Sequence, residues 1–284
     1  MNLVEYLARA TEYLDRQGVD SPRLNAEVML SAMLGISRLE IYTNFDRPLS
    51  EEHAAAYKDM LLERAGGCPL QHITGETGFR GLVLEVRPGV FIPRPETEVL
   101  VEKALEVLPV DSTARVLDLG SGCGNIAVSV AAELPGSTVI AVDIDDAAVR
   151  LARSNADRCG VSDRVEVLSG DLFGPLDAGV VFDLVVSNPP YVPEGARESL
   201  PAEVRDFDPE GALFAGGEGL DVIRRIVAGA PGCLPDGGWL ALEVDESHAG
   251  QVRSMLEADG WTEVEVFEDM AARPRVVRAR WLVR

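Results

Sequence analysis

The sequence is poor in the residues that build metal and disulfide sites. Its 284 residues include only four cysteines and three histidines. The cysteines, at positions 68, 123, 159 and 233, form no Cys-x-x-Cys pair, and the histidines, at 53, 72 and 248, show no ligand-like spacing. Metal ligands commonly occur as closely spaced pairs, and disulfide frameworks belong to oxidising compartments. We therefore expect no metal site and a cytoplasmic location.

Basic residues and long apolar runs are also scarce. Lys and Arg number 26 against 47 Asp and Glu, a formal charge of −21. Such a balance keeps a protein soluble, repels a phosphate backbone and attracts a basic protein. The apolar runs fall short of the roughly 20 residues of a bilayer span, and residues 1–5 do not resemble an export signal. The charge excludes partners better than it identifies them, and we expect neither direct nucleic-acid binding nor membrane binding.

The first third of the chain divides into two regions. Residues 1–67 predict a small helical domain, with helices from Leu3 to about Gly18, from about Pro22, and from about Ser50. Asp20 and Ser21 are both candidate caps for the second helix. Residues 68–92 predict a β-hairpin linker, because glycines separate the short apolar stretches 82–84 and 90–92.

Residues 93–284 predict an α/β domain. A helix is expected to open near Pro95 and continue to about Leu108. Beyond it the expected strands are 115–119, 138–142, 164–168, 181–186, 238–244, 262–267 and 276–283. The expected helices are 125–134, 146–158, 219–230 and 247–259. This alternation predicts a mostly parallel seven-stranded sheet covered on both faces.

A glycine-rich turn follows the first of these strands. Gly120, Gly122 and Gly124 allow the backbone to approach a ligand closely beside a helix start, although a tight strand–helix turn also needs glycines. Asn125 breaks the Gly-x-Gly-x-x-Gly dinucleotide fingerprint. Asp143 ends the second strand, 21 residues after Gly122, where an acid can bind ribose hydroxyls. The pattern predicts a nucleoside-containing ligand.

Two further strand ends carry candidate site residues. Asp171 follows the third strand, where its carboxylate, or the backbone of Leu172, can reach an adenine amine; capping a turn is the alternative. The fourth strand ends at Asn188-Pro189-Pro190-Tyr191. This loop offers acceptors and an aromatic wall but few donors, since proline has no N–H. It suits a planar nitrogen held through its own hydrogens, and it is also typical of a rigid turn.

Together these motifs resemble the Rossmann-like class I methyltransferases that use S-adenosylmethionine. Residues 91–98 (FIPRPETE) and 69–75 (PLQHITG) narrow the resemblance to the peptide-chain release factor glutamine methyltransferase (PrmC/HemK) family, over nearly the whole chain. The resemblance implies methyl transfer to the side-chain amide of the glutamine in the Gly-Gly-Gln motif of class 1 release factors. It also implies that residues 1–67 contribute to release-factor recognition.

The resemblance implies a role for each site residue. The cofactor would be bound by Gly120, Ser121, Gly122, Cys123, Gly124, Asp143, Asp171, Leu172 and Asn188. The substrate amide would be bound by Phe91, Arg94, Asn188, Pro189, Pro190 and Tyr191. Asn188, Pro189 and Tyr191 would be catalytic: the Asn188 oxygen and the Pro189 carbonyl accept the amide hydrogens, and Tyr191 packs on the amide plane.

Three other functions fit parts of the pattern. A ribosomal-protein glutamine methyltransferase shares the Asn188–Tyr191 loop, and residues 94–98 favour the release-factor enzyme over it. An adenine-amino DNA methyltransferase also transfers a methyl group to a planar nitrogen, the exocyclic amine of a flipped base. The charge of −21 opposes this function, because it repels DNA. A non-enzymatic adaptor is opposed by the intact glycines. The chain departs from the family at 244–246 and 271–273, where glycines are common.

Overall fold

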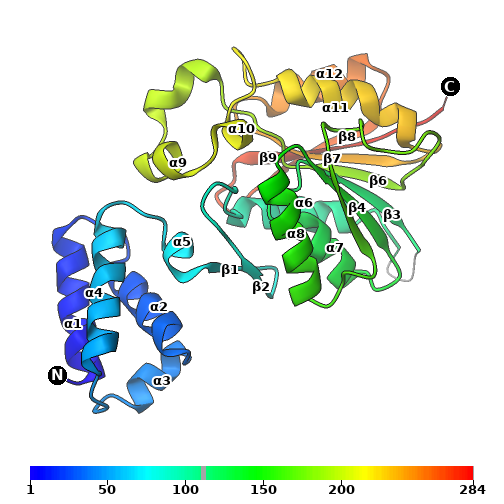
Figure 1. The fold of residues 1–284 in the computed structure, drawn as a ribbon. Helices are drawn as coiled ribbons and strands as arrows, with labels where there is room; N and C mark the ends of the chain where they lie inside the picture. Colours follow the sequence, from blue (N-terminus) through cyan, green and yellow to red (C-terminus); the bar gives the residue numbers. More distant parts are fainter. Residues whose placement is uncertain (110–112, 284) are drawn as a thin grey trace. The chain divides into compact units, whose positions relative to one another are not determined.

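The computed structural model describes residues 1–109 and 113–283, and it divides them into two compact units. One unit contains Met1–Glu76 and Pro201–Phe207. The other contains Thr77–Leu200 and the chain from Asp208 onward. Figure 1 shows the fold, with its elements labelled along the chain.

The first unit is helical, as predicted. Its helices are α1 (Leu3–Arg16), α2 (Pro22–Leu34), α3 (Arg38–Thr43), α4 (Glu51–Ala65) and α5 (Leu70–Thr74). A capping box between Asn2 and Glu5 begins α1, whereas the Ser21 side chain makes no capping hydrogen bond to α2. Tyr57 of α4 lies in the core and its hydroxyl donates to the Ala26 carbonyl at 2.8 Å. The short α3 and α5 were not predicted.

A distant segment completes this unit. The short helix α9 (Ala202–Phe207) comes from between the strands of the α/β region, yet it belongs to the helical unit. Arg64 of α4 donates to the Glu203 carboxylate at 3.1 Å. Nothing in the sequence pattern predicted this connection, because the two residues are 139 positions apart.

The hairpin lies earlier than expected. Its strands are β1 (Glu76–Phe79) and β2 (Leu82–Glu85), joined by a turn in which Arg80 has a φ of 45°. The prediction that 90–92 is a strand is wrong. Val90 and Ile92 are buried, but prolines at 88 and 93 flank the stretch and cannot donate to a ladder.

The second unit contains the predicted seven-stranded sheet. Its strands are β3 (Arg115–Leu119), β4 (Thr138–Asp143), β5 (Val165–Ser169), β6 (Leu184–Ser187), β7 (Trp239–Glu243), β8 (Thr262–Glu268) and β9 (Pro274–Arg280). The order is β5-β4-β3-β6-β7-β9-β8. The first five strands are parallel, and β9 pairs antiparallel with β7 and β8. This confirms the expected class I methyltransferase architecture.

Helices cover both faces of the sheet (Figure 1). One core packs under α6 (Pro95–Leu105), α7 (Asn125–Glu133) and α8 (Asp146–Arg158). The other packs under α11 (Asp221–Gly229) and α12 (Ala249–Ala258). The short elements η1 (Glu194–Ser199), α10 (Glu210–Leu213) and η2 (Ala230–Cys233) were not predicted. Helix α6 also ends earlier than the predicted Leu108.

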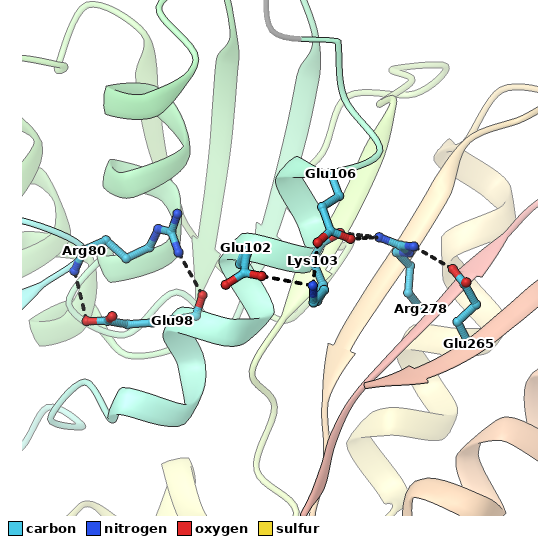
Figure 2. Close-up of polar contacts among 7 residues, drawn as sticks. All are labelled: Arg80, Glu98, Glu102, Lys103, Glu106, Glu265 and Arg278. Carbon is cyan, nitrogen blue, oxygen red and sulfur yellow. Dashed lines mark hydrogen bonds and ion pairs between the residues drawn. The ribbon is translucent and has the colours of Figure 1, made fainter. Parts of the chain in front are cut away.

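Polar contacts fix α6 at both ends (Figure 2). Near its start, Arg80 donates to Glu98 twice, from its backbone N–H to the carboxylate and from its guanidinium to the carbonyl, both at 3.0 Å. Near its end, Arg278 of β9 donates to the Lys103 carbonyl at 2.7 Å and to the Glu265 carboxylate at 2.6 Å. The helix is therefore held against the hairpin turn and the sheet.

Candidate active site

The predicted site residues meet at the carboxyl edge of the parallel strands. Leu119 of β3 is paired with Val142 of β4 on one side and with Ser187 of β6 on the other. Gly120, Asp143 and Asn188 directly follow these three residues in the chain. The structure thus places the glycine loop, the acid and the Asn188 loop side by side, where open α/β sheets bind ligands.

The three glycines have different structural roles. All have positive φ values, 70° at Gly120, 54° at Gly122 and 83° at Gly124. A Cβ atom on Gly120 or Gly122 would meet nothing within 4 Å, so both face open space. A Cβ atom on Gly124 would lie 3.0 Å from the Ala152 Cβ of α8. Two glycines leave room for a ligand, and the third permits helix packing.

Asp143 braces the glycine loop. Its Oδ2 accepts from the Gly122 N–H at 2.7 Å, and its Oδ1 accepts from the Asp145 N–H at 2.9 Å. Burial raises the pKa of this carboxyl, and the backbone hydrogen bonds oppose that shift. A carboxylate oxygen can accept a second bond. Ribose binding by Asp143 is thus compatible with the geometry and stays a prediction.

Asp118 is a site feature that the pattern did not single out. It is fully buried in β3, and its Oδ2 accepts from the Ala127 N–H at the start of α7, at 3.1 Å. Within residues 1–109 and 113–283 its Oδ1 and the buried Ser121 hydroxyl have no hydrogen-bond partner. Burial raises the pKa of Asp118 to about 7. These orphaned atoms beside open glycines fit a loop that holds a polar ligand.

Cys123 and Asn155 attach the glycine loop to the protein core. The Cys123 side chain packs with Val90 and Leu151, and burial raises its pKa to about 12. Its part in the cofactor site would therefore come from its backbone. The Asn155 side chain donates to the Cys123 carbonyl at 2.9 Å and exchanges hydrogen bonds with the backbone of Glu85. Asn155 was missed, because a polar residue inside a helix usually faces solvent.

Asp171 and Leu172 follow β5 at the same edge. The Asp171 carboxylate pairs with Arg225 of α11 at 2.6 Å, and both side chains are about half exposed. Leu172 has a φ of 49° and packs against the core under α11 and α12. Their predicted contact with adenine stays a prediction.

The Asn188–Tyr191 loop is anchored by two buried side chains. The Asn188 Nδ2 donates to the Thr97 hydroxyl of α6 at 3.1 Å. The Tyr191 hydroxyl donates to the Glu243 carboxylate at the end of β7, at 3.3 Å. Pro189, between them, is buried. Because the nitrogen of Asn188 faces Thr97, its oxygen is the end of the amide turned away from that anchor.

Sequence reasoning did not identify either anchor. Thr97 is 0% exposed and Glu243 is 1% exposed. Burial raises the pKa of Glu243 to about 7, while hydrogen bonds from Thr97 and Tyr191 and the charge of Arg275 oppose the shift. One available signal was that Glu243, like Asn188, ends a parallel strand.

Phe91 and Arg94 lie close together before α6. The Arg94 guanidinium sits over the Phe91 ring, 5.2 Å from its centroid. It also forms an ion pair with the buried carboxylate of Asp208. The Arg94 charge is therefore compensated within the protein, and binding of substrate by Phe91, Arg94 and Pro190 stays a prediction.

No three His, Cys, Asp or Glu side chains gather as a metal-binding group in the part of the chain that the structure describes. Among the same residues, the helices are too short or too polar to cross a bilayer.

Comparison with known proteins identifies the family. Residues 5–75 match the model of the PrmC N-terminal domain, and residues 85–204 match that of the methyltransferase small domain. The release factor glutamine methyltransferase of Geobacter sulfurreducens is 44% identical, over 94% of this chain and 93% of that protein. The chain belongs to the release factor glutamine methyltransferase family. The protein of the same name from Deinococcus radiodurans is 40% identical, over 99% of both chains.

Solved structures share the methyltransferase fold. A methyltransferase from Pyrococcus furiosus has a TM-score of 0.55 at 16% identity, over 83% of this chain and all of that one. The Thermus thermophilus 16S rRNA N2 G1207 methyltransferase, solved with AdoMet and guanosine, has a TM-score of 0.55 at 23% identity, over 72% of this chain and 49% of that one. Membership of the release factor glutamine methyltransferase family makes this chain an enzyme that transfers methyl groups.

Proposed function

We propose that this protein transfers a methyl group from S-adenosylmethionine to a protein glutamine. The acceptor is the side-chain amide nitrogen of the glutamine in the Gly-Gly-Gln motif of class 1 release factors. The main support is the Asn188–Tyr191 loop, which lies beside the open glycine loop. The Asn188 side-chain nitrogen donates a hydrogen bond to the Thr97 hydroxyl at 3.1 Å, which leaves the Asn188 oxygen available as an acceptor. The family of the chain supports the same substrate.

The cofactor half of the site is assigned to the glycine loop. Gly120 and Gly122 let the backbone approach the methionine part, Asp143 receives the ribose hydroxyls, and Asp171 with Leu172 borders the adenine. Bound S-adenosylmethionine supplies an electrophilic methyl group on a positively charged sulfur. The buried carboxyl of Asp118, with one oxygen unpartnered among the described residues, provides a polar floor to this half.

The substrate half works by orientation. The Asn188 oxygen and the Pro189 carbonyl accept the two N–H groups of the substrate amide, and Tyr191 packs on the amide plane. This arrangement aims the nitrogen lone pair and favours its pyramidal form, because both hydrogens are held on one side. Orientation of this kind is worth roughly 7–11 kcal/mol in favourable cases. Methyl transfer forms the carbon–nitrogen bond and breaks the carbon–sulfur bond, and S-adenosylhomocysteine leaves. The methylated nitrogen then loses one proton to solvent, which needs no dedicated strong base because an N-protonated amide is strongly acidic.

The organisation of the chain follows from this assignment. We assign residues 1–67 to release-factor recognition, 68–92 to the hairpin linker and 93–284 to methyl transfer in the cytoplasm. An acidic protein of charge −21 suits a protein substrate better than a nucleic acid. The helical unit includes Pro201–Phe207, a segment that follows the Asn188–Tyr191 loop in the chain. This connection in sequence to the proposed substrate loop supports a role of the helical unit in recognition.

A direct assay tests the proposal. The full-length enzyme is incubated with methyl-labelled cofactor and a purified class 1 release factor. A parallel reaction contains the release-factor variant in which the Gly-Gly-Gln glutamine is changed to alanine. We expect label on the first protein alone, and mass spectrometry should place one methyl group on that glutamine. Equal labelling of both proteins refutes the assigned target. Ribosomal proteins and duplex DNA, the latter titrated with salt, serve as competing substrates.

A further inference from the structure

Two buried groups hold the substrate loop from opposite ends. Thr97 lies in the first turn of α6, 91 positions before Asn188, and Glu243 lies at the end of β7, 52 positions after Tyr191. Both are almost completely inaccessible, at 0% and 1% exposure. A buried polar side chain is costly unless it makes hydrogen bonds. Their hydrogen bonds with the loop therefore hold its conformation.

The direction of these hydrogen bonds follows from chemistry. An ionised carboxylate only accepts hydrogen bonds, so the Tyr191 hydroxyl donates to Glu243 Oε1 at 3.3 Å. The Thr97 hydroxyl lowers the pKa of Glu243, as a hydrogen-bond donor does. The Thr97 hydroxyl has one hydrogen. If that hydrogen points to Glu243, only lone pairs remain to face Asn188. The Asn188 amide must then present its NH₂ group to Thr97 and its oxygen away from it.

We propose that Thr97 and Glu243 are positioning residues that set which end of the Asn188 amide faces the substrate glutamine. The inference rests on the proposed function, because it concerns the acceptor that the substrate amide needs. Neither residue touches the reacting atoms. Each acts through the orientation of Asn188 and Tyr191.

Burial raises the pKa of Glu243 to about 7, and the polar groups around it oppose this shift and stabilise the ionised form that this polarity needs. Arg275 of β9 contributes a positive charge, and its guanidinium is held by a hydrogen bond to the Val244 carbonyl at 3.2 Å. The negative charge of Glu96 in α6 raises the pKa of Glu243, but Glu96 forms an ion pair with Arg273 at 3.1 Å. Together with Tyr191 and Thr97, these groups surround the carboxylate on three elements.

Substitutions can reverse the polarity without changing the shape. Thr97→Val replaces the hydroxyl by a methyl group and leaves the Asn188 NH₂ group without its acceptor. Glu243→Gln introduces an NH₂ group that can donate to Thr97, whose own hydrogen then turns to Asn188. In Glu243→Gln the Asn188 amide gains by rotating, which would point donors at the substrate donors. In Thr97→Val neither orientation is favoured, so the Asn188 oxygen is no longer held toward the substrate. Thr97→Ser retains the hydroxyl and is the matched control.

Steady-state methylation of the release factor is the first measurement. We expect Thr97→Val and Glu243→Gln to lower kcat about 10- to 100-fold, as misoriented catalytic groups do. Cofactor Kd by calorimetry and the KM for the release factor should change less than about threefold, because no binding contact is removed. Thr97→Ser should retain kcat within about threefold. Thermal unfolding verifies folding, and Thr97→Ala replaces Thr97→Val if the latter does not fold.

A second measurement reports on Asn188 without turnover. In ¹⁵N-labelled protein, assigned with Asn188→Ala, the Asn188 side-chain NH₂ should exchange slowly with solvent in the wild type and in Thr97→Ser, and quickly in Thr97→Val. Unchanged kcat in Thr97→Val, or equal loss in Thr97→Ser, would overturn the positioning role. Failure of the wild type to methylate the release factor would instead refute the proposed function, and the exchange measurement separates the two.

Discussion

The two halves of the candidate site are built in different ways. The cofactor half is held by backbone groups of neighbouring strands: the Gly120 and Ser121 N–H groups donate to the Val142 carbonyl at 2.8 and 3.1 Å. The substrate half is held by single side chains from distant parts of the chain, Thr97 and Glu243. The first half should thus be sensitive to backbone conformation, and the second to individual side-chain atoms.

The largest effect is expected from Asn188→Ala. The change removes the proposed acceptor of the substrate amide, and loss of one preorganised hydrogen-bonding group commonly costs about 10²- to 10³-fold in kcat. Cofactor affinity, measured by calorimetry, should fall much less, since the glycine loop is untouched. A variant with near-normal turnover would remove orientation by Asn188 from the mechanism.

Asp143→Ala breaks the cofactor half instead. We expect cofactor Kd to rise about 10- to 100-fold, the range for losing hydrogen bonds to a charged group. The Gly122 and Asp145 N–H groups also lose their acceptor. Asp143→Asn, which preserves the shape, is the control with a smaller effect. Calorimetric titration measures both, and unchanged affinity would exclude Asp143 from the ribose.

The glycines provide a sharper comparison within the cofactor half. Gly124→Ala forces a Cβ to within 3.0 Å of the Ala152 Cβ, and such overpacking costs about 1–3 kcal/mol. Gly120→Ala meets open space, so only the left-handed backbone cost of about 1–2 kcal/mol remains. Urea unfolding should show the larger loss for Gly124→Ala. Cofactor binding should suffer more in Gly120→Ala, and the reverse order would contradict these roles.

The pH dependence of stability and of activity should have opposite signs. Asp118 and Glu243 each have a pKa of about 7 when folded, against about 4 when unfolded. The folded protein binds more protons between these values, so its free energy of unfolding should fall as pH rises from about 4 to 7. Turnover should rise through pH 7, because the proposed orientation of Asn188 needs the ionised form of Glu243. Unfolding and rate profiles of Glu243→Gln should lack the Glu243 component.

The smallest effect is expected at the outer edge of the site. Arg225 pairs with Asp171 at 2.6 Å, but both side chains are about half exposed. Such pairs contribute about 0–1 kcal/mol. Arg225→Ala should therefore change the free energy of unfolding by less than about 1 kcal/mol. A larger loss in thermal or urea unfolding would show that the Asp171 turn depends on this pair.

Much of the fold was predictable, because its signals are local. Strand–helix alternation predicted the sheet, and the expected strand 115–119 matches β3 residue for residue. The misses are also local in origin: α3 and α5 are six and five residues long, too short for a helical period. The stretch 90–92 is apolar like a strand but lies between prolines, so it packs without pairing.

The candidate site was predictable only in part. Asp143 stood out by its spacing from Gly122, and Asn188 by the prolines after it. Thr97 lies in the 91–98 segment and Glu243 ends a parallel strand, but neither signal singles out the side chain, because the role of each residue comes from its partner. Ala272 has a φ of 58°, a left-handed conformation that a glycine would adopt at lower cost.

By itself the sequence determined the alternating elements, the glycine turn, the acid at 143 and the donor-poor loop at 188–191, because each depends on residues close together in the chain. Only the tertiary structure decided how that loop is held. The sheet order brings β7 beside β6, and α6 begins beside the strand ends. The Asn188–Thr97 and Tyr191–Glu243 hydrogen bonds join residues that are 91 and 52 positions apart in the chain. They form only once the chain has folded, so no local pattern could encode them.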